Sequence, residues 1–475
     1  MKKYFLSAII TGSAVFSCLS LFAQENAAPR RFCPEVEHMK RQESLDPALK
    51  AKRMQMESVM RNYIQAQKAK PNPSPQAVVT IPVVVHILWN ASRSYQNVSD
   101  AVVNNTIASF NKDLSKTNAD FASMCPGPFQ SKAADCQIQF CLAKQDPSGA
   151  LTTGIIRKQT SYQQFPVFDA SLNFLEYMKF TSKGGDDVWD HNRYLNFWIC
   201  DMNDSRAQIY GYGQFPDQDT INPSPKLAAT DGIVIQYNTL PGAPNGNPTL
   251  NRGRTSVHEF GHFLYLYHIW GDDSNVDGIC GVGETYPAEC NGSDFVADTP
   301  KQCDCHLGKP TFPQKDACAN DPASSNLDGA GDPVNGTMYM NYMDYTDDDH
   351  MVMFTTGQRD RMQAAMYYFR RGLLTSNGCS APSGTGNNEM SLDHFVDVYP
   401  NPSTGSVFIY SSIPNVASAD VMIYNTVGEI VLTKKMTLPQ GNDVELNMTN
   451  IPDGMYFVKL KTSEGTITKK VVINR

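Results

Sequence analysis

Alternating apolar and polar stretches divide the chain into a leader, a polar segment, a mixed central region and a terminal series of short strands. The apolar run from Tyr4 to Val15 follows a positively charged start, which is typical of a secretory signal peptide. We expect residues 1–23 to be that signal, with cleavage after Ala23. A lipoprotein anchored through Cys18 is the weaker alternative, because the residues before Cys18 match a lipobox poorly. The run falls short of the about 20 apolar residues of a membrane-spanning helix, and no later stretch reaches that length.

The segment that follows the leader is polar, and residues 24–76 are rich in Lys, Arg, Gln and Met. Helical spacing runs from Pro47 to Lys68, and the proline-rich residues 71–75 have the composition of a linker. A polar helical segment between a leader and a core is typical of a pro-segment. We therefore expect residues 24–76 to form a pro-segment.

From Ala77 the pattern becomes that of a packed core. Residues 78–88 form a β-branched apolar run, which predicts a buried strand. Ser99 is placed to open a helix whose apolar residues recur at near-helical spacing. Further strands are predicted over residues 136–142, 194–200 and 231–235. Strands followed by helices in this order predict an α+β domain, for which we expect residues 77–379.

The last part of the chain has the pattern of a separate small domain. Residues 380–391 are expected to be a linker, since Gly, Ser, Pro and Asn dominate there. Short alternating strands separated by turns follow, and they predict a β-sandwich over residues 392–475. These predicted strands are 407–410, 421–424, 430–432 and 455–460.

Composition narrows the class of protein. A chain of 475 residues with 41% hydrophobic content is long enough for about two to four domains. The net charge of -8 argues against nucleic-acid binding, which requires a basic patch. Cys18 leaves with the leader, so eleven of the 12 cysteines remain. In an exported protein we expect most of them to form disulfides, and an odd count leaves one over.

The motif that carries chemistry is the stretch from His258 to His268, which contains H-E-x-x-H. Residues four apart share one face of a helix, so His258 and His262 can bind one metal ion together. Glu259 lies beside them, where it can take a proton from metal-bound water. His268 becomes a third ligand only if the helix stops after His262, because six helical residues turn the chain by about 600°.

This stretch resembles the zinc motif of metzincin metalloproteases, and specifically the pappalysin branch that includes ulilysin. Residues 341–345 match that branch's version of the methionine turn. The resemblance implies a metzincin fold in which three histidines hold zinc, Glu259 is the catalytic base, Met343 lies beneath the metal and Tyr345 stabilises the oxyanion. One residue departs from the family, because Tyr265 replaces a glycine. Either the turn holds Tyr265 in a strained conformation or the helix ends differently.

The pro-segment contains a second resemblance. Arg31-Phe32-Cys33 resembles the Arg-x-Cys motif that keeps ulilysin-type precursors inactive. A thiolate is a strong zinc ligand, so Cys33 is expected to act as a latency switch by taking the position of the catalytic water. The alternative is that Cys33 is an ordinary half-cystine.

Oxygen donors are concentrated beyond the histidine motif. Residues 294–300 resemble the calcium loop of ulilysin-like enzymes, in which Asp294 and Thr299 fall on ligand positions and Ala297 offers its carbonyl oxygen. A solvated acidic loop is the alternative, and a second calcium ion stays open. The acidic residues of this region are Asp272, Asp273, Asp277, Glu284, Glu289, Asp294 and Asp298. Glu284 or Glu289 as third zinc ligand is a rival to His268.

The segment after the methionine turn resembles the S1′ wall of the same enzymes. Asp349 falls where they carry an acid, which implies a preference for Arg or Lys after the scissile bond. His350 replaces a half-cystine of ulilysin, so Asp347 or Asp348 is an alternative to Asp349. Residues 355–367 are predicted to form a closing helix with Gln358 and Arg361 on its polar side.

The terminal domain resembles the C-terminal sorting domain of proteins exported by the type IX secretion machinery. The matching segments are Tyr399–Pro402, Gly454–Tyr456 and Lys469–Val472. Together the resemblances imply a secreted or cell-surface zinc endopeptidase, with calcium as a second cofactor and proteins or peptides as substrates. The alternative is a non-enzymatic surface adhesin with a structural zinc site. A structural zinc has four protein ligands and needs no base, so Glu259 favours the enzyme.

Overall fold

The computed structural model describes residues 31–69, 78–203, 208–216, 225–271, 293–300, 302, 305–314, 336–382, 396–411, 413, 416–439, 443–463 and 465–475. The predicted signal peptide and most of the predicted linker at 380–391 lie outside these ranges. So do Asp272, Asp273, Asp277, Cys280, Glu284, Glu289, Cys290, Cys303 and Cys318.

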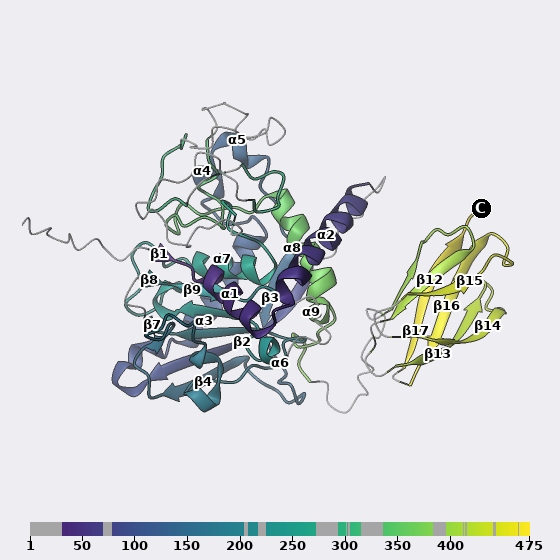
Figure 1. Ribbon diagram of the computed structural model, residues 1–475, viewed down its shortest axis with the longest axis horizontal. Helices are drawn as coiled ribbons and strands as arrows, with labels where there is room; N and C mark the ends of the chain where they lie inside the picture. Colours follow the sequence, from purple (N-terminus) through teal and green to yellow (C-terminus); the bar gives the residue numbers. More distant parts are fainter. Residues whose placement is uncertain are drawn as a thin grey trace, which may run out of the picture.

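A twisted mixed sheet organises the central domain (Figure 1). Its order is β3-β2-β6-β10-β9. Strand β3 pairs with residues 79–83 of β2, and β4 pairs with residues 85–90 of the same strand. The central strand β2 reads as a continuous apolar run because it is buried on both faces. Strand β9 pairs antiparallel with β10 and forms one edge of the sheet within the described residues. The bounds are β2 Val79–Asn90, β3 Ile138–Leu142, β4 Ile155–Thr160, β6 Leu195–Cys200, β9 Gly211–Gly213 and β10 Ile233–Gln236.

Helices α3 (Asp100–Leu114) and α7 (Arg254–Phe263) pack on one face of this sheet. Ser99 caps α3 as predicted, since its side chain accepts a hydrogen bond from the Val102 N–H. A second apolar cluster covers the opposite face and includes Trp198. Short elements fill the connections: η1 Ala91–Gln96, α4 Phe121–Met124, α5 Gly127–Gln130, β5 Phe165–Pro166, η2 Tyr177–Lys179, η3 Thr181–Lys183, β7 Met202–Asn203, β8 Gln208–Ile209, α6 Pro225–Ala228 and η4 Tyr237–Thr239.

Helix α8 (Thr356–Phe369) closes the domain and is followed by α9 (Arg371–Leu374). Thr355 and Gln358 form a capping box at its start. Gln358 and Arg361, predicted on the polar side of this helix, are both buried. The Arg361 guanidinium points into the protein instead, where it forms an ion pair with Glu57.

The described part of the predicted pro-segment contains one short strand and two helices. Helix α2 (Leu49–Lys68) matches the predicted helical stretch, whereas the predictions did not include α1 (Glu35–Leu45). Strand β1 (Arg31–Phe32) runs parallel to β8. Figure 1 shows α2 beside α8, where Glu57 of α2 forms an ion pair with Arg361. The predicted pro-segment is therefore docked on the central domain.

The C-terminal strands form two sheets around their own apolar cluster, as expected of the predicted β-sandwich. One sheet has the order β11-β12-β15 and the other β14-β13-β16-β17. With the helical and sheet layers of the central domain, this confirms the predicted α+β class. The bounds are β11 Val396–Tyr399, β12 Ser406–Ser411, β13 Ser418–Tyr424, β14 Ile430–Thr437, β15 Asp443–Asn447, β16 Gly454–Lys461 and β17 Thr466–Ile473.

The described cysteines include a disulfide and more thiols than predicted. Cys141 of β3 forms a disulfide with Cys379, near the end of the central domain. Cys305 is also disulfide-bonded, but four other described cysteines contradict the expectation that a single thiol is left over. Cys33, Cys125, Cys136 and Cys200 are all buried thiols. Three of them pack in apolar surroundings, and burial raises the pKa of the Cys125 thiol to about 12.

Candidate active site and metal centre

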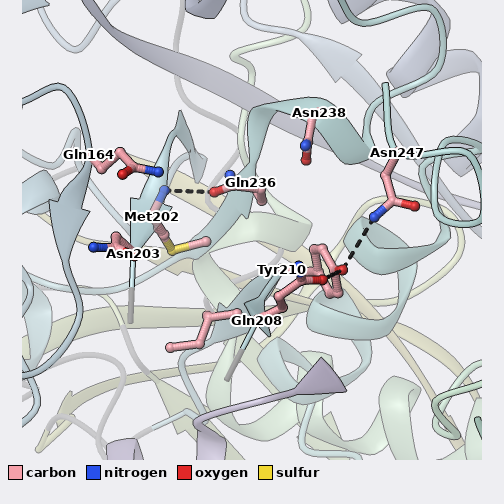
Figure 2. A pocket seen from close by; sticks show the side chains of 9 residues that line it. Gln164, Met202, Asn203, Gln208, Tyr210, Gln236, Asn238 and Asn247 are labelled. Atoms are coloured by element: carbon pink, nitrogen blue, oxygen red, sulfur yellow. Dashed lines mark hydrogen bonds between the residues drawn. The ribbon is translucent and has the colours of Figure 1, made fainter. Parts of the chain in front are cut away.

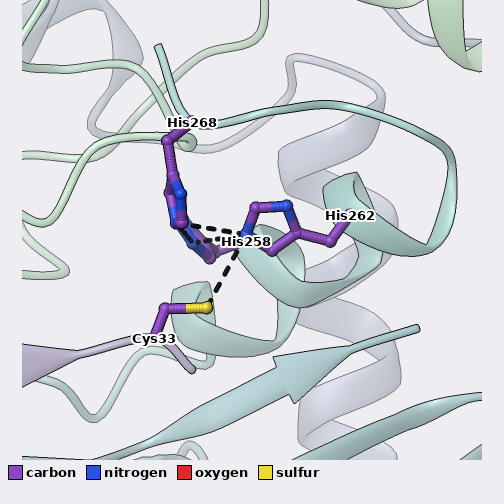
Figure 3. A group of neighbouring side chains, drawn as sticks. All are labelled: Cys33, His258, His262 and His268. Carbon is purple, nitrogen blue, oxygen red and sulfur yellow. Dashed lines mark hydrogen bonds between the residues drawn. The ribbon is translucent and has the colours of Figure 1, made fainter. Parts of the chain in front are cut away.

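Three histidine side chains converge on one point (Figure 3). His258 and His262 come from α7, and His268 follows the turn after that helix. Their Nε2 atoms lie 3.2 Å from one another in all three pairs. Nitrogens bound to one tetrahedral zinc at about 2.0–2.1 Å are about 3.3 Å apart, so the three side chains fit that ion.

The opposite ring nitrogens of the α7 pair are held by the backbone. His258 Nδ1 lies 2.6 Å from the Tyr342 carbonyl oxygen, and His262 Nδ1 lies 2.8 Å from the Leu266 carbonyl oxygen. A carbonyl accepts only from N–H, so each bond places the proton on Nδ1 and leaves the Nε2 lone pair for a metal. The His268 ring stacks on Trp270, with 4.5 Å between ring centroids.

The turn that returns the chain from His262 to His268 is made by Tyr265. Helix α7 ends at Phe263, and Tyr265 adopts a left-handed conformation with φ of 68°. The buried Arg361 holds that turn, since its Nε donates to the Tyr265 carbonyl oxygen over 2.8 Å and its guanidinium carbon lies 5.1 Å from the centroid of the tyrosine ring. Of the two alternatives for this departure from the family, the structure has the strained turn.

The methionine turn lies beneath α7. Any side chain on Gly261 would overlap the Met343 sulfur, so the helix and the turn are in direct contact. Asn341 fixes the turn through two hydrogen bonds with Gln358, of 2.8 and 2.9 Å, and accepts a third from the Met343 N–H. The buried position of Gln358 therefore supports the floor of the site.

Cys33 enters the site from the predicted pro-segment. Its Sγ lies 3.7 Å from His262 Nε2 and 3.7 Å from Glu259 Oε2. In a tetrahedral zinc site the sulfur and nitrogen ligands are about 3.6 Å apart. Tyr345 also lies here, with its hydroxyl 3.1 Å from His268 Nε2 and accepting a hydrogen bond from the Cys33 N–H over 3.2 Å. The structure thus brings together the predicted residues His258, Glu259, His262, His268, Met343, Tyr345 and Cys33.

The edge strand β9 lies directly against Glu259. A Cβ on Gly211 would come 2.8 Å from the Glu259 Cγ, and one on Gly213 would overlap the Glu259 backbone oxygen. Only glycine permits this approach. The predictions left the edge strand of the sheet unassigned, and the structure places β9 there, beside the candidate base.

The residues predicted to bind calcium form a closed local turn. Asp294 is buried, and its carboxylate accepts hydrogen bonds from the Thr299 hydroxyl over 2.7 Å and the Val296 N–H over 3.0 Å. Burial raises the pKa of Asp294 to about 7. Ala297 lies in the same turn, whereas Asp298 accepts from the Gly357 N–H at the start of α8.

The two carboxylates predicted for the S1′ pocket, Asp349 and Asp348, differ from each other in burial and in hydrogen-bond partners. The partly exposed Asp349 forms ion pairs with Lys309 and with His350, whose Nδ1 lies 2.8 Å from Asp349 Oδ1. Although burial acts to raise it, the pKa of Asp349 is lowered by these two partners. Asp348 is buried and accepts from the Arg252 N–H over 2.7 Å, just before α7.

A polar cavity of about 230 Å³ opens beside β8 (Figure 2). Gln208 and Ile209, which pair with the pro-segment strand, also line this cavity. Amide side chains dominate its walls, and the Asn247 Nδ2 donates to the Tyr210 hydroxyl over 3.2 Å. Its amides come from four separate segments of the chain, so no local sequence pattern could have indicated it.

The comparisons with known proteins agree with this site. The family described as Pregnancy-associated plasma protein-A matches residues 181–367, and the Secretion system C-terminal sorting domain matches residues 397–474. An extracellular metalloprotease of Pyricularia oryzae is 28% identical over 299 residues, or 62% of this chain and 78% of that protein. One of Arthroderma benhamiae is 34% identical over 190 residues, or 40% of this chain and about half, 51%, of that protein.

Two solved structures are similar over most of their length. Mature mirolysin of Tannerella forsythia in complex with a cleaved peptide is 37% identical, with a TM-score of 0.51, and 63% of this chain covers 97% of it. A promirolysin mutant of the same organism is 34% identical, with a TM-score of 0.54, and 72% of this chain covers 95% of it.

The two-histidine helix, the turned third histidine and the methionine turn on an α+β core define a metalloendopeptidase of the metzincin class. The chain belongs to the pappalysin family of these enzymes and ends in a type IX sorting domain. It therefore acts on peptide bonds with a bound metal, engages the secretion machinery, and is secreted or held at the cell surface. Within the described ranges, no helix has the length and apolarity needed to cross a membrane.

Proposed function

We propose that the chain is a zinc endopeptidase made as a precursor that Cys33 keeps inactive. The observation that carries the proposal is the position of the Cys33 thiol, 3.7 Å from a histidine nitrogen and from the carboxylate of the candidate base. The four candidate ligand atoms of Cys33, His258, His262 and His268 all lie within 4.8 Å of one another. Four such donors complete a tetrahedral zinc site and leave no position for water.

His258, His262 and His268 would hold the zinc ion, which when bound supplies a Lewis acid for the scissile carbonyl and for water. Glu259 accepts the proton of the attacking water and passes it to the leaving nitrogen. Its carboxylate lies beside β9, which has no strand on its outer edge among the described residues and can bind an extended substrate by strand addition. Tyr345 donates a hydrogen bond to the oxyanion from a hydroxyl already 3.1 Å from His268.

Latency follows from the contacts of Cys33. The thiol lies between His262 and Glu259, and the Cys33 N–H donates a hydrogen bond to the Tyr345 hydroxyl. Both groups assigned to catalysis are therefore engaged by the same pro-segment residue. Release of residues 24–76 frees the carboxylate, the hydroxyl and the fourth ligand position at once.

Two variants test the proposal. Glu259→Ala should lose peptide hydrolysis by several orders of magnitude while zinc content stays near one per chain, and persistent hydrolysis contradicts the role of Glu259. Cys33→Ser should convert itself to the mature form prematurely. Cys125→Ser, which changes another buried thiol, is the matched control and should stay latent. A Cys33→Ser precursor as latent as this control contradicts the switch.

We also propose a preference for Arg or Lys after the scissile bond, exerted by Asp349. Lys309 already lies on this carboxylate, with 53% of its side chain exposed, so a substrate cation has to displace it. An exposed ion pair contributes about 0–1 kcal/mol of stability, so displacing Lys309 from Asp349 costs little free energy. A guanidinium binds a carboxylate through two hydrogen bonds, which favours Arg over Lys in this competition.

A calcium ion at Asp294, Ala297 and Thr299 is proposed on the sequence resemblance. The buried Asp294 carboxylate supports it, because a cation would offset the burial that raises its pKa to about 7. Calcium should raise the unfolding temperature of the wild type but not of Asp294→Asn. An equal rise in both proteins contradicts the site.

A further inference from the structure

His38 of the pro-segment fills a slot in the catalytic domain that has aromatic walls and an acidic end. The side chain is fully buried, and its ring centroid lies 5.1 Å from that of Phe174 and 5.3 Å from that of Tyr212. At the end of the slot, His38 Nε2 lies 3.2 Å from Glu176 Oε1. Arg41, one turn further along α1, donates from Nε to Glu176 Oε2 over 3.2 Å.

Glu176 therefore faces three basic side chains, of which the pro-segment supplies two. The third is Lys179, whose Nζ donates to Glu176 Oε1 over 2.9 Å and to the Thr230 carbonyl oxygen over 2.6 Å. Although burial acts to raise it, the pKa of Glu176 is held well below its usual range, chiefly by Lys179 and His38. When α1 leaves, Lys179 is the one basic partner that the carboxylate keeps among the described residues, and Oε2, which accepts from Arg41 here, faces the vacated space.

The slot lies beside the strand along which an extended substrate can pair. Tyr212 is the central residue of β9, between the two glycines that abut Glu259. Successive residues of a strand point to opposite faces, so the Tyr212 ring and Glu176 lie across the sheet from the candidate base. A substrate strand added to β9 would direct every second side chain toward this slot.

We propose that the slot formed by Phe174, Tyr212 and Glu176 is a substrate subsite of the mature enzyme that selects a cationic side chain away from the scissile bond. This subsite rests on the proposed function, because it opens only when the pro-segment is released. A guanidinium fits its chemistry, since the aromatic walls attract a cation and the carboxylate offers two acceptor oxygens. In the precursor, His38 and Arg41 stand in for that substrate side chain.

The test compares peptides that share one scissile bond and the residue after it. Arg or citrulline, which has the same shape without the charge, is placed in turn at each other position. At one position, or at alternate positions, Arg should raise kcat/KM by about tenfold in the mature wild type, as expected of a hydrogen bond to a charged group. In Glu176→Gln the ratio of kcat/KM between the Arg and citrulline peptides should fall to about one, because the amide has lost the charge that distinguishes them.

Equal cleavage of Arg and citrulline peptides at every position by the wild type overturns the subsite, as does a ratio that persists in Glu176→Gln. Failure to cleave any peptide would instead contradict the proposed function. If Glu176→Gln does not fold, because Lys179 has lost its partner, a second experiment on the wild type alone decides the question.

A peptide of residues 34–46, which lacks Cys33, should inhibit the mature wild-type enzyme about tenfold better than the same peptide with His38→Ala and Arg41→Ala. Equal inhibition by the two overturns the subsite.

Discussion

Gly261 of the active-site helix rests directly on the sulfur of Met343, with no room for even one additional carbon atom between them. The two residues are 82 positions apart in the sequence, yet each determines where the other can lie. Because Gly261 immediately precedes His262, any displacement of this contact moves a candidate metal ligand.

Gly261→Ala tests that contact. Overpacking a tight core costs about 1–3 kcal/mol, so we expect a lower unfolding temperature together with weaker retention of zinc on dialysis. Thermal unfolding and metal analysis measure the two effects. Gly127→Ala is the matched control, since nothing lies within 4 Å of a Cβ added there. Equal behaviour of the two variants would show that the methionine turn does not support the metal ligands.

The Glu57–Arg361 ion pair provides a second prediction. Glu57→Ala leaves the buried Arg361 guanidinium without its carboxylate, and breaking a buried pair costs about 3–5 kcal/mol. The precursor should therefore unfold at lower temperature and convert faster, as followed by calorimetry and gel electrophoresis. Glu43→Ala removes the partly exposed partner of Arg53 and should change stability by about 1 kcal/mol or less. If Glu43→Ala has the larger effect, this contact does not anchor the pro-segment.

The docking of α1 should weaken at alkaline pH. Burial lowers the pKa of His38, but the charge of Glu176, aided by Glu35, outweighs burial and raises it. Protonated His38 therefore stabilises the precursor below the ordinary value of about 6.5, and that stabilisation is lost as pH rises through the raised value. In an inactive Glu259→Ala background, His38→Gln should lower the unfolding temperature at acidic pH and have a diminishing effect toward alkaline pH. A difference that grows with pH contradicts this sign.

Removing Lys309 should sharpen the selectivity of the enzyme. Lys309→Met frees Asp349 from its internal cation, so kcat/KM for Arg after the scissile bond should rise severalfold while that for Leu stays constant. Parallel kinetics on the two peptides measure the change. Lys116→Met, at a lysine that hydrogen-bonds to the Ala133 carbonyl oxygen instead, is the control. An unchanged ratio of Arg to Leu would exclude Asp349 from the pocket.

Much of the fold follows from local patterns. The β-branched run of β2, the Ser99 cap of α3 and the short strands of the C-terminal sandwich are each determined by residues close in sequence. The histidine spacing likewise requires a helix that ends after His262, because the third imidazole cannot otherwise return to the first two. The structure satisfies this with Tyr265 in a left-handed turn.

What the sequence could not predict depends on contacts between distant segments. The spacing along α8 places Arg361 on the polar face of the helix, which is ordinarily solvated. Its charge is buried because Glu57 of the docked α2 accepts a hydrogen bond from it. The thiols of Cys125, Cys136 and Cys200 are compatible with an exported protein because apolar packing, rather than oxidation, protects them. The slot around His38 joins α1, the loop at Phe174 and β9, so no spacing rule indicates it.

The most direct test of the account is zinc X-ray absorption spectroscopy on the Glu259→Ala precursor before and after removal of the pro-segment. The account predicts three nitrogen ligands at about 2.0–2.1 Å and one sulfur at about 2.3 Å in the precursor, with the sulfur replaced by oxygen after removal. A precursor spectrum without sulfur, or one with fewer than three imidazoles in either form, would contradict it.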